Sequence, residues 1–220
     1  DSFVESRRQK TSEKDRKTVQ SILNDVRKNG DSAVKKYERK FNRRRTSQLR
    51  VSAKEIKEAR SKISSNERKA LEVIWSGIDW DQGNLHRYLK DFTRWWAEDR
   101  AADEVQVKSF VPIPSVGCYV PGGQARYPSS VVMSVTPAKR AGVKRIVVVS
   151  PPGRDGKIDP LTIAAAKKCG ATEIYKVGGV QAIGALAYGT KSIPKVDKIV
   201  GPGGKFVSIA KSLVSDQVAI

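Results

Sequence analysis

The sequence predicts an α/β protein, with a Rossmann-like parallel sheet covered by helices on both faces and a mainly helical segment before it. From about residue 111, short β-branched runs alternate with helical stretches, and each run ends in a Gly/Pro turn. Continuous apolar strands are typical of a sheet that is buried on both faces. Residues 1–110 show helical spacing instead, so we expect them to form the first part of a split domain and residues 111–220 to form the Rossmann-like domain.

The N-terminal segment opens with two predicted helices. The first has an apolar face at i, i+3, i+4 and i+7, formed by Val19, Ile22, Leu23 and Val26. Asn29-Gly30 should end it, and Asp31 can cap the next helix. The apolar stripe of that helix is Ala33, Val34, Tyr37 and Phe41.

Three further helical stretches are expected before residue 110. Ser52 and Glu55 have the S-x-x-E spacing of a capping box, and Asn66 is a candidate cap for the helix that follows. The run "NLHRYLKDFTRWWAEDR" mixes basic and aromatic residues, which could stack on bases. Its apolar residues fall on one helical stripe, which favours packing against a domain or a partner subunit, and we interpret His86 beside it as structural. That stripe consists of Leu85, Leu89, Phe92 and Trp96.

The second half reads as four strand-turn-helix units. The predicted strands are Val116 to Val120, Ile146 to Val149, Ile174 to Val177 and Ile199-Val200. Helical stretches lie between or after them, at 128–142, 159–170, 180–190 and 205–214. Pro137 should kink or end the first of these helices, whereas Gly170 is a good stop for the second.

The Gly/Pro turns should share one edge of the sheet, because ligands of such folds bind outside the carboxyl ends of the strands. We therefore expect "YVPGG", "KVGGVQ" and "VGPGG" to face one crevice of nucleotide size. "GPGGKF" has Phe206 where G-x-G-x-x-G needs its last glycine, and Ile199 excludes G-x-x-x-x-G-K. The spacing predicts a binding site and no particular reaction.

Composition limits the classes of partner. The net charge is +19, and the excess is spread evenly: residues 1–110 carry 27 basic and 18 acidic groups and the rest 15 and 5. This even distribution argues against a dedicated nucleic-acid arm, and a basic scaffold stays an alternative. Cys118 and Cys169 sit in apolar contexts as expected core residues, and a single histidine, His86, is too few for a zinc site within this chain.

No run approaches the roughly 18 apolar residues of a membrane span. The N-terminus, Asp1-Ser2-Phe3, has neither an initiator Met nor the apolar block of a signal peptide. We expect a cytoplasmic protein without membrane contact, and a chain that is a fragment of a longer one.

The ordered motifs resemble one family. "VGCYVPGGQARYPSSVVMSVTPAKRAGVKRIVVVSPP" and "YKVGGVQAIGALAYGTKSIPKVDKIVGPGGKFVSIAK" are similar, in order and spacing, to the histidinol dehydrogenase family from Pro112 to Lys211. The first 110 residues fit it more loosely, through "VRKNGDSAVKKYERKF" and "LRVSAKEIKEA". The resemblance implies an NAD-dependent, zinc-requiring homodimer that oxidises L-histidinol to L-histidine through the aldehyde; a related branch acts on sulfonated diols.

The resemblance also implies three cofactor-binding positions, which makes residues 111–220 an NAD-binding domain. They are Tyr119 of "YVPGG", Gln181 of "GGVQAI" and the position of the Asn that ends "GPGN", here Gly204. Gly204 lacks the side-chain amide, so this position offers the cofactor no side-chain hydrogen bond. Structural alternatives stay open: Tyr119 as a half-buried strand residue and Gln181 as a helix cap.

The family's zinc ligands, its Glu-His acid/base pair and its substrate-binding residues correspond to sequence beyond Ile220. We therefore expect no catalytic and no metal-binding residue within this chain, and no activity from the 220 residues alone. The alternatives are a degenerate, non-catalytic paralogue that binds nucleotide and a basic nucleic-acid scaffold.

Overall fold

The structure is a computed structural model that describes residues 12–42, 48–98, 109–123, 125–153 and 155–220. Its centre is a four-stranded sheet with the strand order β3-β2-β1-β4. The strands are β1 (Ser115–Tyr119), β2 (Arg145–Ser150), β3 (Glu173–Lys176) and β4 (Lys198–Val200). All three pairings are parallel, which confirms the predicted sheet.

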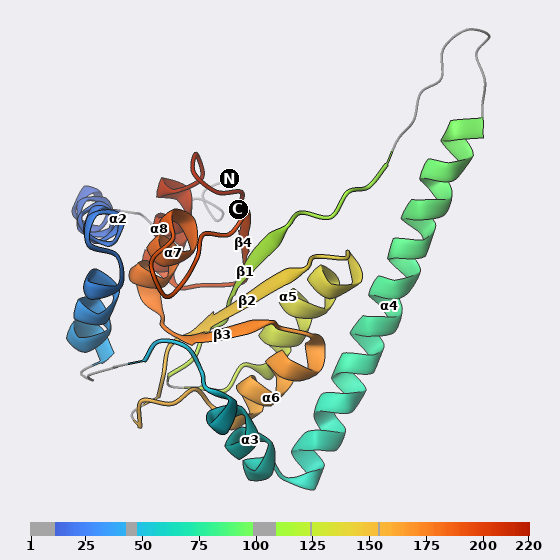
Figure 1. Ribbon diagram of the computed structural model, residues 1–220, viewed down its shortest axis with the longest axis horizontal. Coiled ribbons are helices and arrows are strands. Elements are labelled where there is room, and N and C mark those ends of the chain that lie inside the picture. Colours follow the sequence, from blue (N-terminus) through green and yellow to red (C-terminus); the bar gives the residue numbers. More distant parts are fainter. Residues whose placement is uncertain (1–11, 43–47, 99–108, 124, 154) are drawn as a thin grey trace, which may run out of the picture.

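Helices cover both faces of the sheet, as predicted (Figure 1). On one face lie α5 (Pro128–Arg140) and α6 (Pro160–Cys169), and on the other lie α7 (Gly179–Tyr188) and α8 (Lys205–Leu213). The helices of the N-terminal segment pack outside these on both sides. Helix α2 (Glu13–Asn42) packs on α7 and α8, α3 (Ala53–Lys62) on α6, and α4 (Ser65–Glu98) mainly on α5.

Alternate residues of each strand enter opposite cores, because successive side chains of a strand point to opposite faces. Val147 and Val149 of β2 join the core under α2, α7 and α8. Ile146 and Val148 of the same strand join the core under α5 and α6. All four side chains are fully buried, which explains why the strands read as continuous apolar runs.

The N-terminal helices follow the sequence closely, with two corrections at their caps. Helix α2 is interrupted at Gly30 (φ 52°, ψ −130°), as predicted, and Ser52 and Glu55 form the capping box. Asp31 was the predicted cap of the second helix. Its carboxylate instead accepts hydrogen bonds from Ser192 (2.6 Å to Oγ, 3.2 Å to N), and so it ties α2 to the loop after α7. The predicted cap at residue 66 is wrong.

The cap of α4 is Ser64, whose hydroxyl accepts from the Glu67 N–H at 3.2 Å while the Glu67 carboxylate accepts from the Ser64 N–H at 2.7 Å. This is a second capping box, and it places Asn66 inside the first turn. The sequence "SSN" offers three cap residues in a row, and the position of the glutamate selects among them.

The helix does not end early at Pro137, since α5 continues to Arg140; that Pro137 kinks the helix stays a prediction. A proline at this position removes the hydrogen bond to the carbonyl four residues earlier, that of Met133. Met133 lies on the solvent side with 65% of its surface exposed, where water can replace the missing donor. The stop at Gly170 is confirmed: α6 ends at Cys169 and Gly170 is left-handed (φ 101°).

Both outer strands have a neighbour from elsewhere in the chain. Residues 49–51 run antiparallel to β3, with Lys176 N donating to Leu49 O at 2.7 Å and Val51 N to Ile174 O at 2.8 Å. Ala219 lies parallel to β4, where its carbonyl accepts from Ile199 N at 2.8 Å. Each edge strand therefore has part of its backbone paired.

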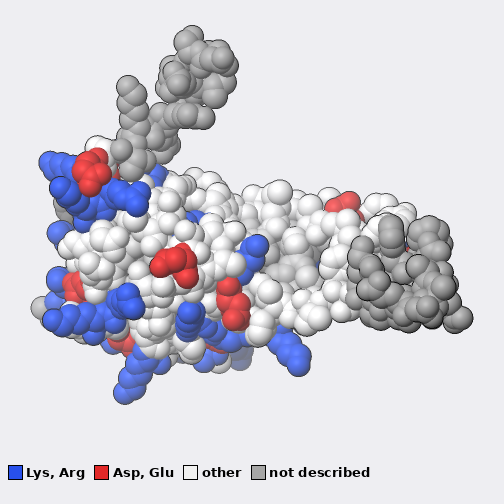
Figure 2. Space-filling view, turned by 90° about the horizontal axis from the view of Figure 1, so that it is seen from above, with Lys and Arg blue, Asp and Glu red and all other residues white. Residues whose placement is uncertain are grey.

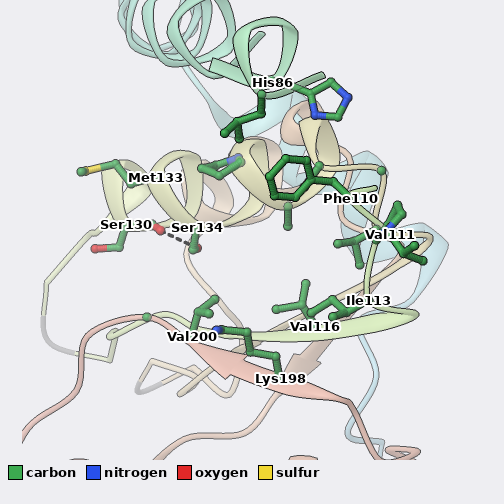
Figure 3. Close-up of a pocket in the computed structure, with 18 of the residues that line it drawn as sticks. His86, Phe110, Val111, Ile113, Val116, Ser130, Met133, Ser134, Lys198 and Val200 are labelled. Carbon is green, nitrogen blue, oxygen red and sulfur yellow. Dashed lines mark hydrogen bonds between the residues drawn. The ribbon is translucent and has the colours of Figure 1, made fainter. Parts of the chain in front are cut away.

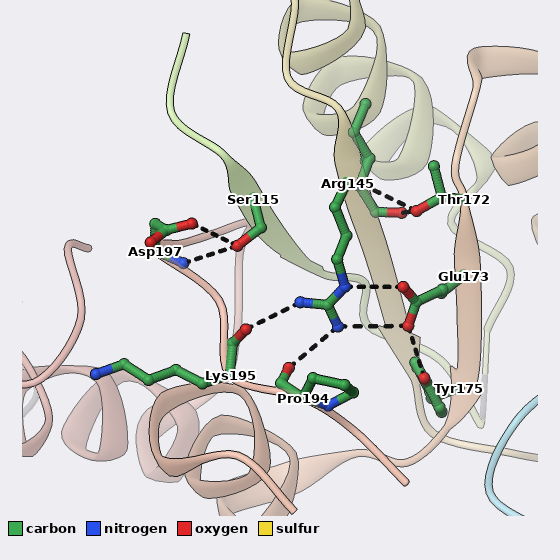
Figure 4. Close-up of polar contacts among 9 residues, drawn as sticks. Ser115, Arg145, Thr172, Glu173, Tyr175, Pro194, Lys195 and Asp197 are labelled. Carbon is green, nitrogen blue, oxygen red and sulfur yellow. Dashed lines mark hydrogen bonds and ion pairs between the residues drawn. The ribbon is translucent and has the colours of Figure 1, made fainter.

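The amino-terminal edge of the sheet is held by a polar network (Figure 4). The Arg145 guanidinium binds the Glu173 carboxylate at 2.8 Å and also donates to two carbonyls of the loop before β4, those of Pro194 and Lys195. Glu173 also accepts from the Tyr175 hydroxyl at 2.7 Å. These contacts join β2, β3 and that loop at the edge opposite the Gly/Pro turns.

The aromatic part of α4 stays accessible. Leu85 and Phe92 of the predicted stripe are 49% and 55% exposed, and the side chain of Trp96 lies outside the described residues. That this stripe packs against a domain or a partner subunit stays a prediction.

Figure 2 shows basic side chains gathered at the end of the molecule that carries α2 and α8. Within the described residues, no helix combines the length and the apolar character that crossing a membrane needs.

Candidate functional site

The strand order reverses between β1 and β4, and this is where sheets of this type bind ligands. From β1 the chain moves outward through β2 to β3, then returns to the other side of β1 as β4. The loops after β1 and β4 therefore start side by side at the carboxyl edge. Gly201 (φ 104°) makes this approach possible, because a Cβ built on it would lie 2.1 Å from the Tyr119 carbonyl oxygen.

Tyr119 ends β1 with its ring in the core and its hydroxyl at the start of α7. The residue is 5% exposed, and its hydroxyl oxygen accepts from the Gly179 N–H at 3.1 Å. Burial raises the pKa of the Tyr119 phenol, Gly179 lowers it in part, and the nearby Glu38 raises it further. The net increase keeps the phenol protonated at neutral pH.

Gln181 lies in the first turn of α7 and is 1% exposed. Its amide nitrogen donates to Glu38 Oε1 at 2.8 Å, and the same carboxylate oxygen accepts from the Gly178 N–H at 2.9 Å. Among the described residues, no group donates to Gln181 Oε1, although this atom is buried. Tyr119 and Gln181 therefore meet at the N-terminus of α7.

Glu38 belongs to this site although the sequence patterns did not predict it. It is 1% exposed although it lies in a helix rich in solvated charges. One signal could have found it: Glu38 is four residues after Val34 and next to Tyr37, on the apolar side of that helix. A carboxylate on a core-facing position needs partners, and α7 provides two of them.

Gly204, the third predicted position, lies apart on the loop between β4 and α8. It is the N-cap residue of α8, with extended backbone (φ −69°, ψ 178°) and no side chain to cap the helix. A Cβ built on it meets nothing within 4 Å. The structure thus brings Tyr119 and Gln181 together and leaves Gly204 on a separate, exposed turn.

Two cations hold the loops of this edge in place. Arg126, in the loop after β1, binds Glu67 of α4 at 2.6 Å and Asp159, the N-cap of α6, at 2.9 Å. Lys211 of α8 donates to the Gly201 carbonyl at 2.6 Å, and burial lowers the pKa of its ammonium group.

A separate apolar cleft of about 870 Å³ lies on the α5 side of the sheet (Figure 3). Met133 and Ser134 of α5, Val116 of β1 and Val200 of β4 form its walls, and His86 of α4 lies at its rim. It reaches Gly201 but is not lined by Tyr119, Gln181 or Gly204. His86 thus lies at the rim of this cleft, and its structural role stays a prediction.

Within the described ranges, no three His, Cys, Asp or Glu side chains lie close enough together to hold a metal ion. Both cysteines are free and buried. Burial raises the pKa of the Cys118 thiol to about 12 and raises that of Cys169. Neither is a thiolate at neutral pH, which suits the core role expected of them.

Comparison with known proteins assigns the family. The family model described as histidinol dehydrogenase matches residues 5–220 of the chain. The chain belongs to the histidinol dehydrogenase family. Curated histidinol dehydrogenases from Methanosarcina mazei and Methanococcus maripaludis are 45% and 47% identical to it, over 90% and 92% of this chain. The resemblance seen in the motifs is thereby confirmed, and it extends into the N-terminal helices.

A solved histidinol dehydrogenase from Elizabethkingia anophelis has the same fold, with a TM-score of 0.81 and 31% identity over 96% of this chain. The chain spans about half the length of these family members: 45% and 46% of the two curated relatives and 47% of the crystallised chain.

Proposed function

We propose that this chain is the cofactor-binding part of an NAD-dependent, zinc-requiring histidinol dehydrogenase. In that role it contributes to the oxidation of L-histidinol to L-histidine, through the aldehyde, in a cytoplasmic homodimer. The observation that carries the proposal is the meeting of Tyr119 and Gln181 at Gly179, on the carboxyl edge of the sheet of a histidinol dehydrogenase family member.

NAD, when bound, would supply the hydride acceptor for oxidation of the alcohol. This chain's own residues bind and orient it. The protonated Tyr119 hydroxyl offers a donor, the buried Gln181 Oε1 an acceptor, and Gly201 lets the loops after β1 and β4 approach each other. Position 204 adds no side-chain hydrogen bond, so we expect weaker NAD binding than an asparagine there would give.

The residues described here do not fit a zinc site, and no step is assigned to zinc on this chain. A positioned base is also needed to take the proton of the alcohol. We propose that the zinc ligands and the Glu-His pair belong to polypeptide corresponding to the other half of the relatives. The 220 residues alone should therefore bind NAD and leave histidinol unoxidised.

The test is NADH formation from L-histidinol, with NAD and zinc supplied. We expect none from the purified chain and a measurable rate after addition of the C-terminal half of the M. mazei relative. A Tyr119→Phe chain in the same mixture should need more NAD for half-maximal rate. Turnover by the chain alone would contradict the placement of the chemistry outside it.

A non-catalytic paralogue that binds nucleotide is the second candidate, and Gly204 is the observation that favours it. This candidate predicts NAD binding by calorimetry and no NADH from any complemented mixture.

The net charge of +19 favours a nucleic-acid scaffold. A nucleic-acid scaffold would bind RNA or DNA with an affinity that falls steeply as the salt concentration rises.

A further inference from the structure

Two of the backbone donors at the start of α7, those of Gly178 and Gly179, are occupied from within the protein. Helix N-termini attract anions, because their first N–H groups lack helical partners. Here the Gly178 N–H donates to Glu38 at 2.9 Å and the Gly179 N–H donates to the Tyr119 hydroxyl at 3.1 Å. A carboxylate of the protein itself, 1% exposed, therefore already lies at this helix end.

Glu38 also determines which way the Gln181 amide points. The Gln181 Nε2 group donates to Glu38 Oε1 at 2.8 Å, so the amide turns its nitrogen toward Glu38. Its oxygen then points away from Glu38, toward Gly179. A Cβ built on Gly179 would lie 3.0 Å from Gln181 Oε1, and Gly179 itself is partly exposed.

Two groups beside Gly179 have unused hydrogen-bonding capacity, one as an acceptor and one as a donor. Gln181 Oε1 is a buried acceptor with no donor among the described residues. The Tyr119 hydroxyl uses its oxygen as an acceptor for Gly179, and its own hydrogen is directed to none of the acceptors that the structure describes. One acceptor and one donor therefore face the same partly exposed glycine.

We infer that Glu38 is a positioning residue that fixes the Gln181 amide, and that the start of α7 takes a neutral group which both donates and accepts, not a phosphate. A carboxamide or a sugar hydroxyl has this character, and NAD contains both. That the ligand is NAD rests on the proposed function; the fixed amide and the exclusion of phosphate rest on the contacts of Glu38.

A phosphate at this position would meet an unfavourable field. It can accept from Tyr119, but it has no hydrogen for Gln181 Oε1 and would lie near the Glu38 carboxylate in a poorly solvated site. The pyrophosphate of a bound dinucleotide should therefore lie away from α7. Removing the charge of Glu38 gives opposite results for the two kinds of occupant.

The first experiment needs no variant. The Gly178 and Gly179 amide signals and the Gln181 side-chain amide signals are followed by ¹⁵N NMR during titration with NAD and, separately, with inorganic pyrophosphate. NAD should shift Gly179 and Gln181, and pyrophosphate should shift none of them. Saturable shifts at Gly178 and Gly179 with pyrophosphate would overturn the exclusion of phosphate.

The second experiment is Glu38→Gln, which keeps an acceptor but removes the charge and lets the Gln181 amide turn either way. NAD binding should weaken by about tenfold, the loss of one buried hydrogen bond. Tighter NAD binding would mean that a phosphate sits there and is relieved of repulsion. Glu173→Gln is the matched control, since it neutralises a partly buried carboxylate at the opposite edge (Figure 4) and should leave NAD affinity unchanged.

The two proposals can fail separately. If the wild-type chain binds no NAD, the proposed function fails. The positioning role of Glu38 is then tested by the Gln181 side-chain amide signals alone. Those protons should exchange slowly in the wild type and faster in Glu38→Gln. Equal exchange in both proteins would refute the positioning role, whatever the NAD result.

Discussion

At the scale of single residues, the site combines positions of different kinds. Tyr119 and Gln181 are buried and bonded to their own protein before any ligand arrives. Gly204 is exposed and unconstrained. Substitution at 204 therefore reports on the ligand with little disturbance of the core, whereas substitution at 119 or 181 disturbs both.

Gly204→Asn should stabilise the fold slightly and tighten NAD binding. Asparagine is a better N-cap than glycine by a few tenths of a kcal/mol, and residue 204 has the extended backbone and the open space that the side chain needs. A new hydrogen bond to NAD adds roughly 0.5–1.5 kcal/mol of affinity. Calorimetry and urea unfolding measure the two effects separately.

Gly204→Ala is the control for that change, because it adds a Cβ without an amide. It should lower the stability of α8 slightly and leave the NAD affinity as it is. If Gly204→Asn stabilises the protein and leaves NAD affinity unchanged, residue 204 does not touch the cofactor in this chain.

At the scale of elements, α2 and α7 pack closely because Gly184 has no side chain. A Cβ built there lies 3.2 Å from Val26 and 3.3 Å from Leu23, both fully buried on α2. The site depends on this contact, since α2 carries Glu38 and α7 carries Gln181.

Leucine at Gly184 and at Gly77 should change stability in opposite directions. Gly184→Leu forces α2 away from α7 and should cost about 1–3 kcal/mol. Gly77 is exposed in α4 with nothing near it, so Gly77→Leu should gain about 0.5–1 kcal/mol from helix propensity. Urea unfolding measures both, and a neutral Gly184→Leu would show that α2 and α7 are less tightly packed.

The ion pair between α4 and the loop after β1 should give an acid-dependent stability. The Ser64 backbone N–H, Arg126 and the Ser64 hydroxyl lower the pKa of Glu67 from 4.5 to about 2. A lowered folded pKa stabilises the protein above the unfolded pKa, and this stabilisation disappears as the pH falls from about 4.5 to 2. The melting temperature of Glu67→Gln should thus lie below that of the wild type at pH 6 and meet it near pH 2. A constant difference would contradict the assignment.

At the scale of the whole molecule, the N-terminal helices complete both faces of the sheet. Val19, Leu23 and Val26 of α2 are fully buried in one core, while α3 and α4 close the other. The division into domains at about residue 110 stays a prediction. These contacts argue that the two segments stabilise each other.

Unfolding should therefore be a single transition for both segments. All four tryptophans, at 75, 80, 95 and 96, lie in α4, so their fluorescence reports the N-terminal segment, while far-UV circular dichroism reports all helices. The two signals should have the same urea midpoint. An earlier fluorescence midpoint would show that residues 111–220 stay folded after α4 has detached.

The sequence by itself determined the family, the parallel sheet and the positions of its turns. These follow from local patterns, namely β-branched runs, glycine turns and the capping box at Ser52, whose physics acts within a few residues. The tertiary structure alone decided that Asp31 binds Ser192, that α5 continues through Pro137, and that Glu38 meets Gln181 at a sequence separation of 143. From sequence alone, a charged residue in a helix is predicted to be solvent-exposed. Glu38 is buried because α2 packs on α7, and that packing depends on the whole fold.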